Sequence, residues 1–134
     1  MLNVFRYTFL PLLVMLVIFI GTCLITSEQV PDMPQGIAWD KLVHFGMFFV
    51  LSAASLFSYY KWCGGKPKMG RWLFWGFAMP VVYGGVIELL QKYVFTHRGA
   101  EWGDFVANTL GSLVACVLVV WVLSEPQFSQ DFQD

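Results

Sequence analysis

The stretch FVANTLGSLVACVLVVWVLS, residues 105–124, contains no charged side chain. Its length matches the about 20 residues that a helix needs to cross the hydrocarbon core of a bilayer. Three further uncharged runs precede it, at residues 7–26, 45–60 and 72–87. The chain of 134 residues is 57% hydrophobic and only 13% charged, whereas soluble domains carry about 25% charged residues. The sequence therefore predicts an all-α integral membrane bundle of four transmembrane helices, with residues 1–124 forming one domain.

The second and third runs reach the length of a span only if their polar flanks are also helical. These flanks are residues 41–44 before the second run and residues 88–91 after the third. Including them places ionisable side chains in the outer turns of membrane helices. Such a side chain costs roughly 2.5 to 3.5 kcal/mol at the centre of a span and less near the interface, so it is a functional candidate by default.

The first run also permits an interpretation as a secretory signal peptide. Its apolar core is longer than the roughly 7 to 15 residues of a cleaved signal, and no A-x-A cleavage site follows it. Thr22 is a poor residue directly before Cys23 for a lipoprotein signal. We therefore predict an uncleaved span. Residues 125–134 are predicted to form a short polar tail on the cytoplasmic side.

The loop between the second and third runs predicts the orientation. Residues 61–71 carry four basic residues and no acid, and short basic loops remain cytoplasmic. Both termini are then cytoplasmic, and residues 27–39 and 92–103 lie outside. Tryptophans near the predicted span ends are typical of an interfacial aromatic belt: Trp39, Trp62, Trp72, Trp102 and Trp121.

Three spans carry polar residues at their predicted outer ends. In each span two of them share a helix face because they lie three or four positions apart: Asp40 and His44, Glu88 and Gln91, and Asp104 and Asn108. Lys41 lies beside the first pair, and Arg98 lies in the loop before the last. These eight residues form the predicted binding site.

Small residues predict how the last span packs. They recur at every fourth position and allow membrane helices to approach closely: Gly103, Ala107, Gly111 and Ala115. In the third span Pro80 removes a backbone donor. Together with Gly84 and Gly85, it is predicted to leave room beneath Glu88 for a cavity or a close neighbour.

The predicted site contains more acids than bases. Asp40, Glu88, Glu101 and Asp104 outnumber Lys41 and Arg98. Either a carboxyl is protonated by burial and like-charge repulsion, or His44 or His97 is charged, or a cationic ligand or metal completes the site. Glu88 lies near the C-terminal end of a helix, where the dipole disfavours an acid, so we predict that it pairs with Arg98 or Lys41.

Structural explanations compete with a binding site. Asp40 and Asp104 are each suited to the start of a helix, and the whole set could serve only to hold the helices together. The three cysteines match no zinc or redox pattern. The sequence predicts no cofactor, no resident metal and no nucleic-acid partner.

The order of these motifs resembles the VanZ-like family of bacterial membrane proteins. The resemblance covers about residues 37–115 and rests on three patterns and one residue: Asp40-Lys41-x-x-His44-Phe45, Glu88-x-x-Gln91, Arg98 and Asp104-x-x-x-Asn108-x-x-Gly111. The family often has a small residue or Ser between the Arg and the Asp, where this chain has Glu101 and Trp102. The resemblance implies a multi-pass protein of the bacterial inner membrane with a role in the cell envelope. It supplies no settled biochemical activity, although the family is named for a member linked to reduced susceptibility to the glycopeptide teicoplanin.

Three hypotheses about function follow. The first is an outward-facing polar pocket that binds a lipid headgroup, an envelope precursor or a glycopeptide-type amphiphile. The second is an integral-membrane enzyme, in which a carboxylate acts as general acid or base while Lys41 and Arg98 hold an anionic group. The third is a structural or assembly partner in the membrane.

Overall fold

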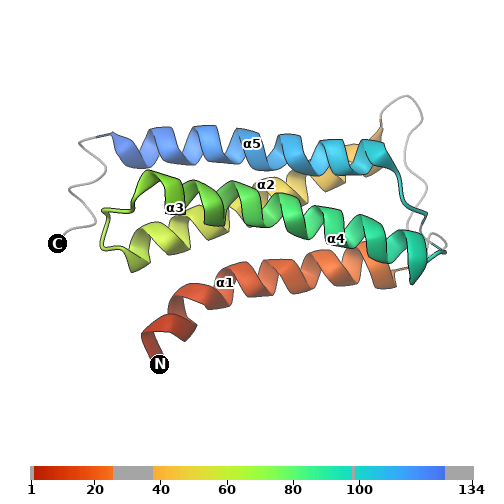
Figure 1. The fold of residues 1–134 in the computed structure, drawn as a ribbon, viewed down its shortest axis with the longest axis horizontal. Helices are drawn as coiled ribbons and strands as arrows, with labels where there is room; N and C mark the ends of the chain where they lie inside the picture. The colour runs from red at the N-terminus through yellow and green to blue at the C-terminus, as the bar shows by residue number, and fades with distance from the viewer. Residues whose placement is uncertain (1, 26–37, 98, 126–134) are drawn as a thin grey trace.

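A computed structural model describes residues 2–25, 38–97 and 99–125. In these parts, four helices are long and apolar enough to cross a membrane: Asn3–Leu24, Trp39–Trp62, Met69–Tyr93 and Trp102–Ser124. The predicted all-α bundle of four spans is therefore confirmed. The start of the first helix, the end of the last and the turn between the second and third spans lie at the same end of the bundle (Figure 1).

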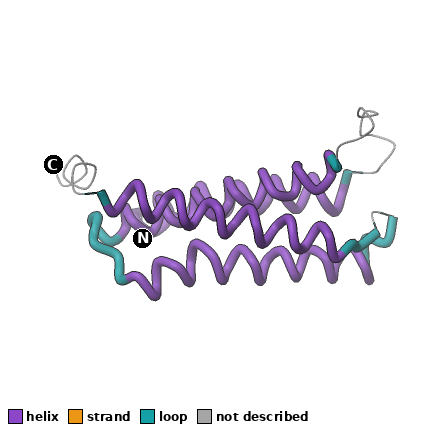
Figure 2. The backbone as a smooth tube through the Cα atoms, turned by 90° about the horizontal axis from the view of Figure 1, so that it is seen from above, coloured by secondary structure: helices purple, strands orange, loops and turns teal. Residues whose placement is uncertain are grey.

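Two of the four spans contain a change in helix type. The elements in chain order are α1 (Leu2–Phe19), the π-helical turn η1 (Ile20–Leu24), α2 (Trp39–Trp62), α3 (Met69–Leu73), the π-helical turn η3 (Phe74–Ala78), α4 (Met79–Tyr93) and α5 (Trp102–Ser124). Seen from above, these helices run alongside one another (Figure 2). The polar residues at 40–44, 88–91 and 104 lie inside helices, as their spacing predicts.

The outer surface of the bundle is apolar. Leu16, Val82 and Val117 are 53%, 67% and 62% exposed, and similar side chains are exposed along every span. Soluble proteins rarely leave such extended apolar surfaces uncovered. These side chains are therefore expected to contact lipid acyl chains.

The interior is divided into two apolar clusters of buried side chains. The first contains Ile18, Phe48 and Leu51. The second contains Leu56, Tyr60, Trp72, Cys116 and Leu123. The first helix is joined to α4 by polar contacts as well, because Tyr83 Oη donates to the Met15 carbonyl at 2.6 Å.

The tightest packing is between α5 and α2. A Cβ on Gly111 would overlap the carbonyl oxygen of Phe45, and one on Gly103 would lie 2.6 Å from Cε of Lys41. Ala107 and Ala115 on the same face are buried. The predicted packing role of this small-residue face is confirmed, and it brings the first turns of α2 and α5 together.

Pro80 explains the π-helical turn before α4. Proline has no N–H to donate to the carbonyl four residues earlier, which belongs to Gly76. The Met79 N–H bonds to the Phe74 carbonyl, five residues earlier, and Cys116 Sγ donates to the Gly76 carbonyl at 3.3 Å. One turn further, the space beside Gly84 is filled by Phe48 and Asn108, which lie 3.1 and 3.3 Å from where a Cβ would be. The sequence predicted either a cavity or a close neighbour beneath Glu88, and at Gly84 the structure has the close neighbour.

The tryptophans predicted to form an aromatic belt differ in their exposure. Trp62, Trp102 and Trp121 are 51%, 84% and 63% exposed. Trp72 differs, because it is buried and its Nε1 donates to the Leu56 carbonyl at 2.9 Å. A backbone carbonyl in the interior satisfies this indole, so Trp72 is a core residue.

Candidate functional site

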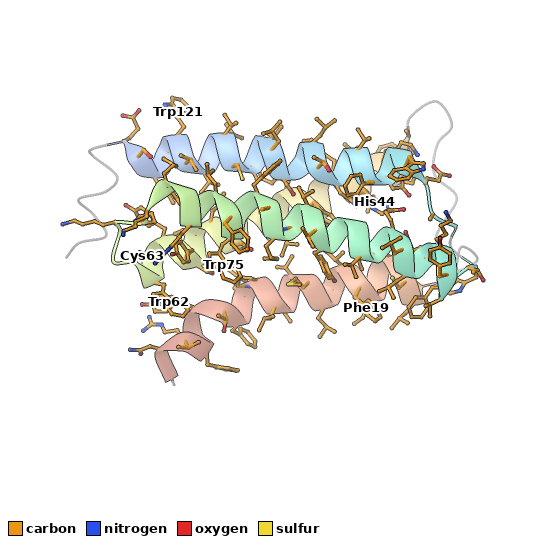
Figure 3. The ribbon with its side chains drawn as sticks, in the orientation of Figure 1. Phe19, His44, Trp62, Cys63, Trp75 and Trp121 are labelled. Carbon is orange, nitrogen blue, oxygen red and sulfur yellow. The ribbon has the colours of Figure 1, made fainter. Side chains whose placement is uncertain are left out.

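The polar residues gather at one end of the bundle. The first turns of α2 and α5 meet the last turns of α4 there, because α2 and α5 run parallel to each other and antiparallel to α4. His44 lies near this end, whereas Trp62 and Cys63 lie at the opposite end (Figure 3). We call this group of side chains the polar cluster: Asp40, Lys41, His44, Glu88, Glu101, Asp104 and Asn108.

Lys41 forms the exposed rim of the polar cluster. Its Nζ lies 2.8 Å from Glu101 Oε2, 3.2 Å from Asp40 Oδ2 and 3.4 Å from Asp104 Oδ1. The side chains of Asp40 and Glu101 are 60% and 61% exposed. One ammonium thus connects three carboxylates on α2 and at the start of α5.

His44 forms the buried floor. Its Nδ1 lies 3.0 Å from Asn108 Oδ1, and its Nε2 lies 3.5 Å from Asp104 Oδ2. His44, Asp104 and Asn108 are 5%, 7% and 0% exposed. The amide nitrogen Nδ2 of Asn108 has no hydrogen-bond partner in the described part of the chain. The cluster therefore grades from an exposed rim to a floor closed off from solvent.

Glu88 enters the polar cluster from α4. Its Oε2 accepts a hydrogen bond from the backbone N–H of Glu101 at 3.2 Å. Its Oε1 is buried and has no partner among residues 2–25, 38–97 and 99–125. Within the same residues, no Lys or Arg lies at ion-pair distance from Glu88, so the predicted pairing with Lys41 is wrong. Arg98 lies outside the described residues, and its pairing with Glu88 stays a prediction.

Gln91 is the one described residue of the predicted site that points elsewhere. It is 2% exposed, and its Nε2 donates to the Thr22 carbonyl at 2.8 Å. Gln91 therefore fastens α4 to the end of the first span. Gln91 lies three residues after Glu88, so the two were predicted to share a helix face. The hydrogen bond from Gln91 to Thr22 in η1 directs its amide away from the polar cluster.

Glu101 was left without a role by the sequence. It directly precedes α5, and it contributes both a carboxylate to Lys41 and a backbone N–H to Glu88. Its position three residues before Asp104 was the available signal, since residues three apart lie on one side at a helix start.

Helix capping does not account for Asp40 and Asp104. Neither α2 nor α5 has a side-chain cap hydrogen bond. Both acids lie in the first turn, where the helix dipole favours them, but their carboxylates contact Lys41 and, for Asp104, His44. The contacts of Asp104 with Lys41 and with His44 join α2 to α5, so part of the cluster also stabilises the bundle.

The polar cluster has two groups of side chains with the geometry to hold a cation. The first is Asp40, Glu101 and Asp104, and the second is His44, Glu88 and Asp104. A groove of about 480 Å³ lies at the other end of the bundle instead, lined by apolar side chains of α3, η3 and α5 such as Leu73, Phe77 and Val117. Its chemistry suits an acyl chain, and none of its lining residues is an Asp, Glu, Lys, Arg or His.

The fold and the site together define an all-α membrane protein with a charged cluster at one end of its spans. The chain matches no protein-family model, no curated protein and no solved structure at a significant level. The resemblance to the VanZ-like family therefore rests on the sequence motifs.

Proposed function

We propose that this chain is a VanZ-like protein of the bacterial inner membrane with a role in the cell envelope. In this proposal both termini are cytoplasmic, the polar cluster faces outward, and it binds the headgroup of an envelope lipid, an envelope precursor or a glycopeptide-type amphiphile. The ligand's apolar part lies against the exposed apolar faces of the helices. A multi-pass membrane location is consistent with the four apolar spans.

The main support for the proposal is the change in solvent exposure across the polar cluster, from an exposed rim to a buried floor. A purely structural cluster would satisfy its buried polar atoms internally, because an unsatisfied buried group costs about 1 to 3 kcal/mol. Here Glu88 Oε1 and Asn108 Nδ2 are buried without partners in the described chain. Five other buried side-chain atoms share this state, namely Ser52 Oγ, Ser55 Oγ, Tyr60 Oη, Gln91 Oε1 and Ser112 Oγ. Glu88 Oε1 and Asn108 Nδ2 differ from them because they lie beside an exposed charged rim, where a ligand that reaches between the helices would satisfy them.

The charge of the polar cluster restricts the headgroup. Asp40, Glu101 and Asp104 already surround Lys41, and Glu88 adds a fourth carboxylate. A bare phosphate would be repelled by this arrangement. The cluster therefore takes a headgroup that contains, or arrives with, a positive charge.

Native mass spectrometry of Glu88→Gln tests the proposed function. The detergent-purified protein is stripped of lipid, incubated with a bacterial lipid extract, and its bound lipids are identified by mass. We expect wild type to retain a headgroup-specific adduct and Glu88→Gln to lose most of it, because the substitution removes the buried carboxylate. The control is Glu125→Gln, an exposed acid at the opposite end. Identical adducts in wild type and Glu88→Gln would contradict the proposal, and a new product mass formed only by wild type would favour the enzyme hypothesis.

The natural cysteines test the orientation without further engineering. Cys23 and Cys116 are buried, whereas Cys63 is partly exposed in the turn after α2. We expect a membrane-impermeant maleimide to label no cysteine in intact cells and to label Cys63 in inverted membrane vesicles. The Cys63→Ser variant should abolish the vesicle signal. Labelling of Cys63 from outside intact cells would invert the topology and place the polar cluster on the cytoplasmic side.

A further inference from the structure

We propose that His44, Glu88 and Asp104 form a binding site for a divalent transition-metal ion, with zinc as the best-fitting metal. The three side chains come from α2, α4 and α5, so the ion would join three spans. Each offers one ligand atom, and the three atoms lie within 4.8 Å of one another. Imidazole and carboxylate are both common zinc ligands, and three protein ligands with one open position are typical of a zinc site that binds a further ligand.

The orientation of His44 supports a metal. Asn108 Oδ1 is an acceptor, so the Nδ1 of His44 that faces it at 3.0 Å carries the hydrogen. In the neutral ring, Nε2 then presents a lone pair to Asp104 Oδ2. Histidines that bind metals are usually held in this way, with the second ring nitrogen donating to an oxygen acceptor.

The distance between His44 and Asp104 also fits a shared ion. Nε2 and Oδ2 lie 3.5 Å apart, beyond the usual N–H···O distance of about 2.7 to 3.2 Å. Two ligands about 2.0 to 2.1 Å from a tetrahedral zinc are separated by roughly 3.3 Å. The pair is therefore spaced as two ligands of one metal would be.

Glu88 supplies a further observation. Its side chain is half-buried, and its Oε1 is closed off from solvent and unpartnered in the described chain. A carboxyl oxygen in such a place is satisfied by a proton, by a hydrogen-bond donor or by a cation. The ligand atoms of Glu88, His44 and Asp104 lie within 4.8 Å of one another, so modest side-chain movements would bring all three onto one metal ion.

The alternative acid group already has its cation. Nζ of Lys41 lies within 3.4 Å of Asp40, Glu101 and Asp104. A metal there would have to displace the ammonium. The group of His44, Glu88 and Asp104 includes no Lys or Arg, and its imidazole distinguishes transition metals from magnesium and calcium, which prefer oxygen ligands.

The inference rests on the proposed function in one respect. It requires the polar cluster to bind a ligand and not only to stabilise the packing of the helices. It also deepens that function. A zinc ion would add positive charge to a cluster in which four acidic residues are accompanied by the single ammonium of Lys41. Its open coordination position would accept an oxygen of a headgroup phosphate, which the acidic cluster alone would repel.

Zinc binding to the full-length chain in detergent tests the inference. The protein is purified with an affinity tag that contains no histidine, treated with a chelator and titrated with zinc chloride against a chromophoric competitor. We expect one zinc per chain, with magnesium and calcium failing to displace it. X-ray absorption of the zinc-loaded protein should show a single imidazole among oxygen ligands at about 2.0 to 2.1 Å.

Four variants locate the site. His44→Ala, Glu88→Gln and Asp104→Asn should each bind zinc at least about 100-fold more weakly than wild type, because replacing a residue that only supports a ligand already costs about 10- to 100-fold. The matched control is His97→Ala, because His97 is the other histidine of the chain and is exposed in the loop after α4. Circular dichroism of each variant verifies that the helices remain.

Three results would overturn the inference. They are a wild-type protein that binds no zinc stoichiometrically, zinc binding that survives in His44→Ala, and equal competition by calcium. The wild-type titration decides the question even if a variant fails to fold. If lipid adducts persist in chelator-treated protein that binds no zinc, the metal site is rejected and the headgroup site is kept. If zinc binds but no lipid does, the metal site stands alone.

Discussion

The Gly111→Val variant is expected to unfold at much lower temperature or denaturant concentration than wild type. Gly111 lies on α5 where that helix crosses α2, and even a Cβ at this position would overlap the Phe45 carbonyl oxygen. A backbone carbonyl inside a helix cannot move aside as a flexible side chain can. The two helices would have to separate, and this would also pull the first turns of α2 and α5 apart.

The expected loss is at least about 3 kcal/mol, at the upper end of the 1 to 3 kcal/mol typical of overpacking. Gly46→Val is the matched control, because Gly46 also lies inside a helix, on α2, and has open space around it. Both variants lose the same stability from placing a β-branched valine in a helix. The difference between their stabilities therefore measures the contact of residue 111 with Phe45. Unfolding of the two proteins in mixed micelles with increasing dodecyl sulfate, followed by circular dichroism, measures it. Equal midpoints for the two variants would show that the α2–α5 contact is looser than described.

The Asn108→Ala variant should show the second large effect on stability. Asn108 is fully buried, and its Oδ1 lies 3.0 Å from Nδ1 of His44. Removing the amide leaves the imidazole N–H unsatisfied, which costs about 1 to 3 kcal/mol, but it also removes the unpartnered Nδ2, which relieves a similar cost. The lost side-chain volume adds a cavity term. We expect a net loss of about 1 to 3 kcal/mol in metal-free protein.

Thr109→Ala is the control for Asn108→Ala. Thr109 is the next residue on α5, but its hydroxyl donates to the Phe105 carbonyl of its own helix at 2.9 Å. Its removal should cost less than about 1 kcal/mol, because the carbonyl keeps its helical hydrogen bond. The same unfolding assay compares the two variants. A loss for Asn108→Ala no greater than that for Thr109→Ala would mean that the His44–Asn108 contact does not form.

The fold was predictable because membrane spans obey simple physical rules. Length and apolarity alone identify a segment that can cross a bilayer, and the four runs all became helices of that length. The small-residue face of α5 was predictable for a similar reason, since spacing by four fixes a helix face whatever lies opposite. Neither inference required knowledge of a distant contact.

The site was predictable only in part because its contacts depend on tertiary structure. Helical spacing placed Asp40, His44, Asp104 and Asn108 on suitable faces at one end. It could not show that Gln91 would bond to the Thr22 carbonyl, or that Glu101 would bond to both Lys41 and Glu88. Trp72 illustrates the same limit, since a buried carbonyl on α2 decided its position.

The central claim is that the polar cluster is a ligand site, and Glu88→Gln tests it most directly through stability. In metal-free, delipidated protein the substitution keeps an oxygen to accept the Glu101 N–H and removes one ionisable carboxyl group from an acidic cluster. A residue whose role is ligand binding often lowers the stability of the folded protein, so replacing it leaves that stability unchanged or raises it. A residue kept for an ion pair behaves in the opposite way, and breaking a buried pair costs about 3 to 5 kcal/mol.

The deciding measurement is the unfolding midpoint of metal-free, delipidated Glu88→Gln beside that of wild type, in the same mixed micelles. We predict a midpoint equal to or above that of wild type, together with the loss of the bound adduct in native mass spectrometry. A midpoint lowered by the equivalent of about 3 kcal/mol or more would contradict the account and assign Glu88 to an ion pair that holds the helices together, such as the predicted pair with Arg98.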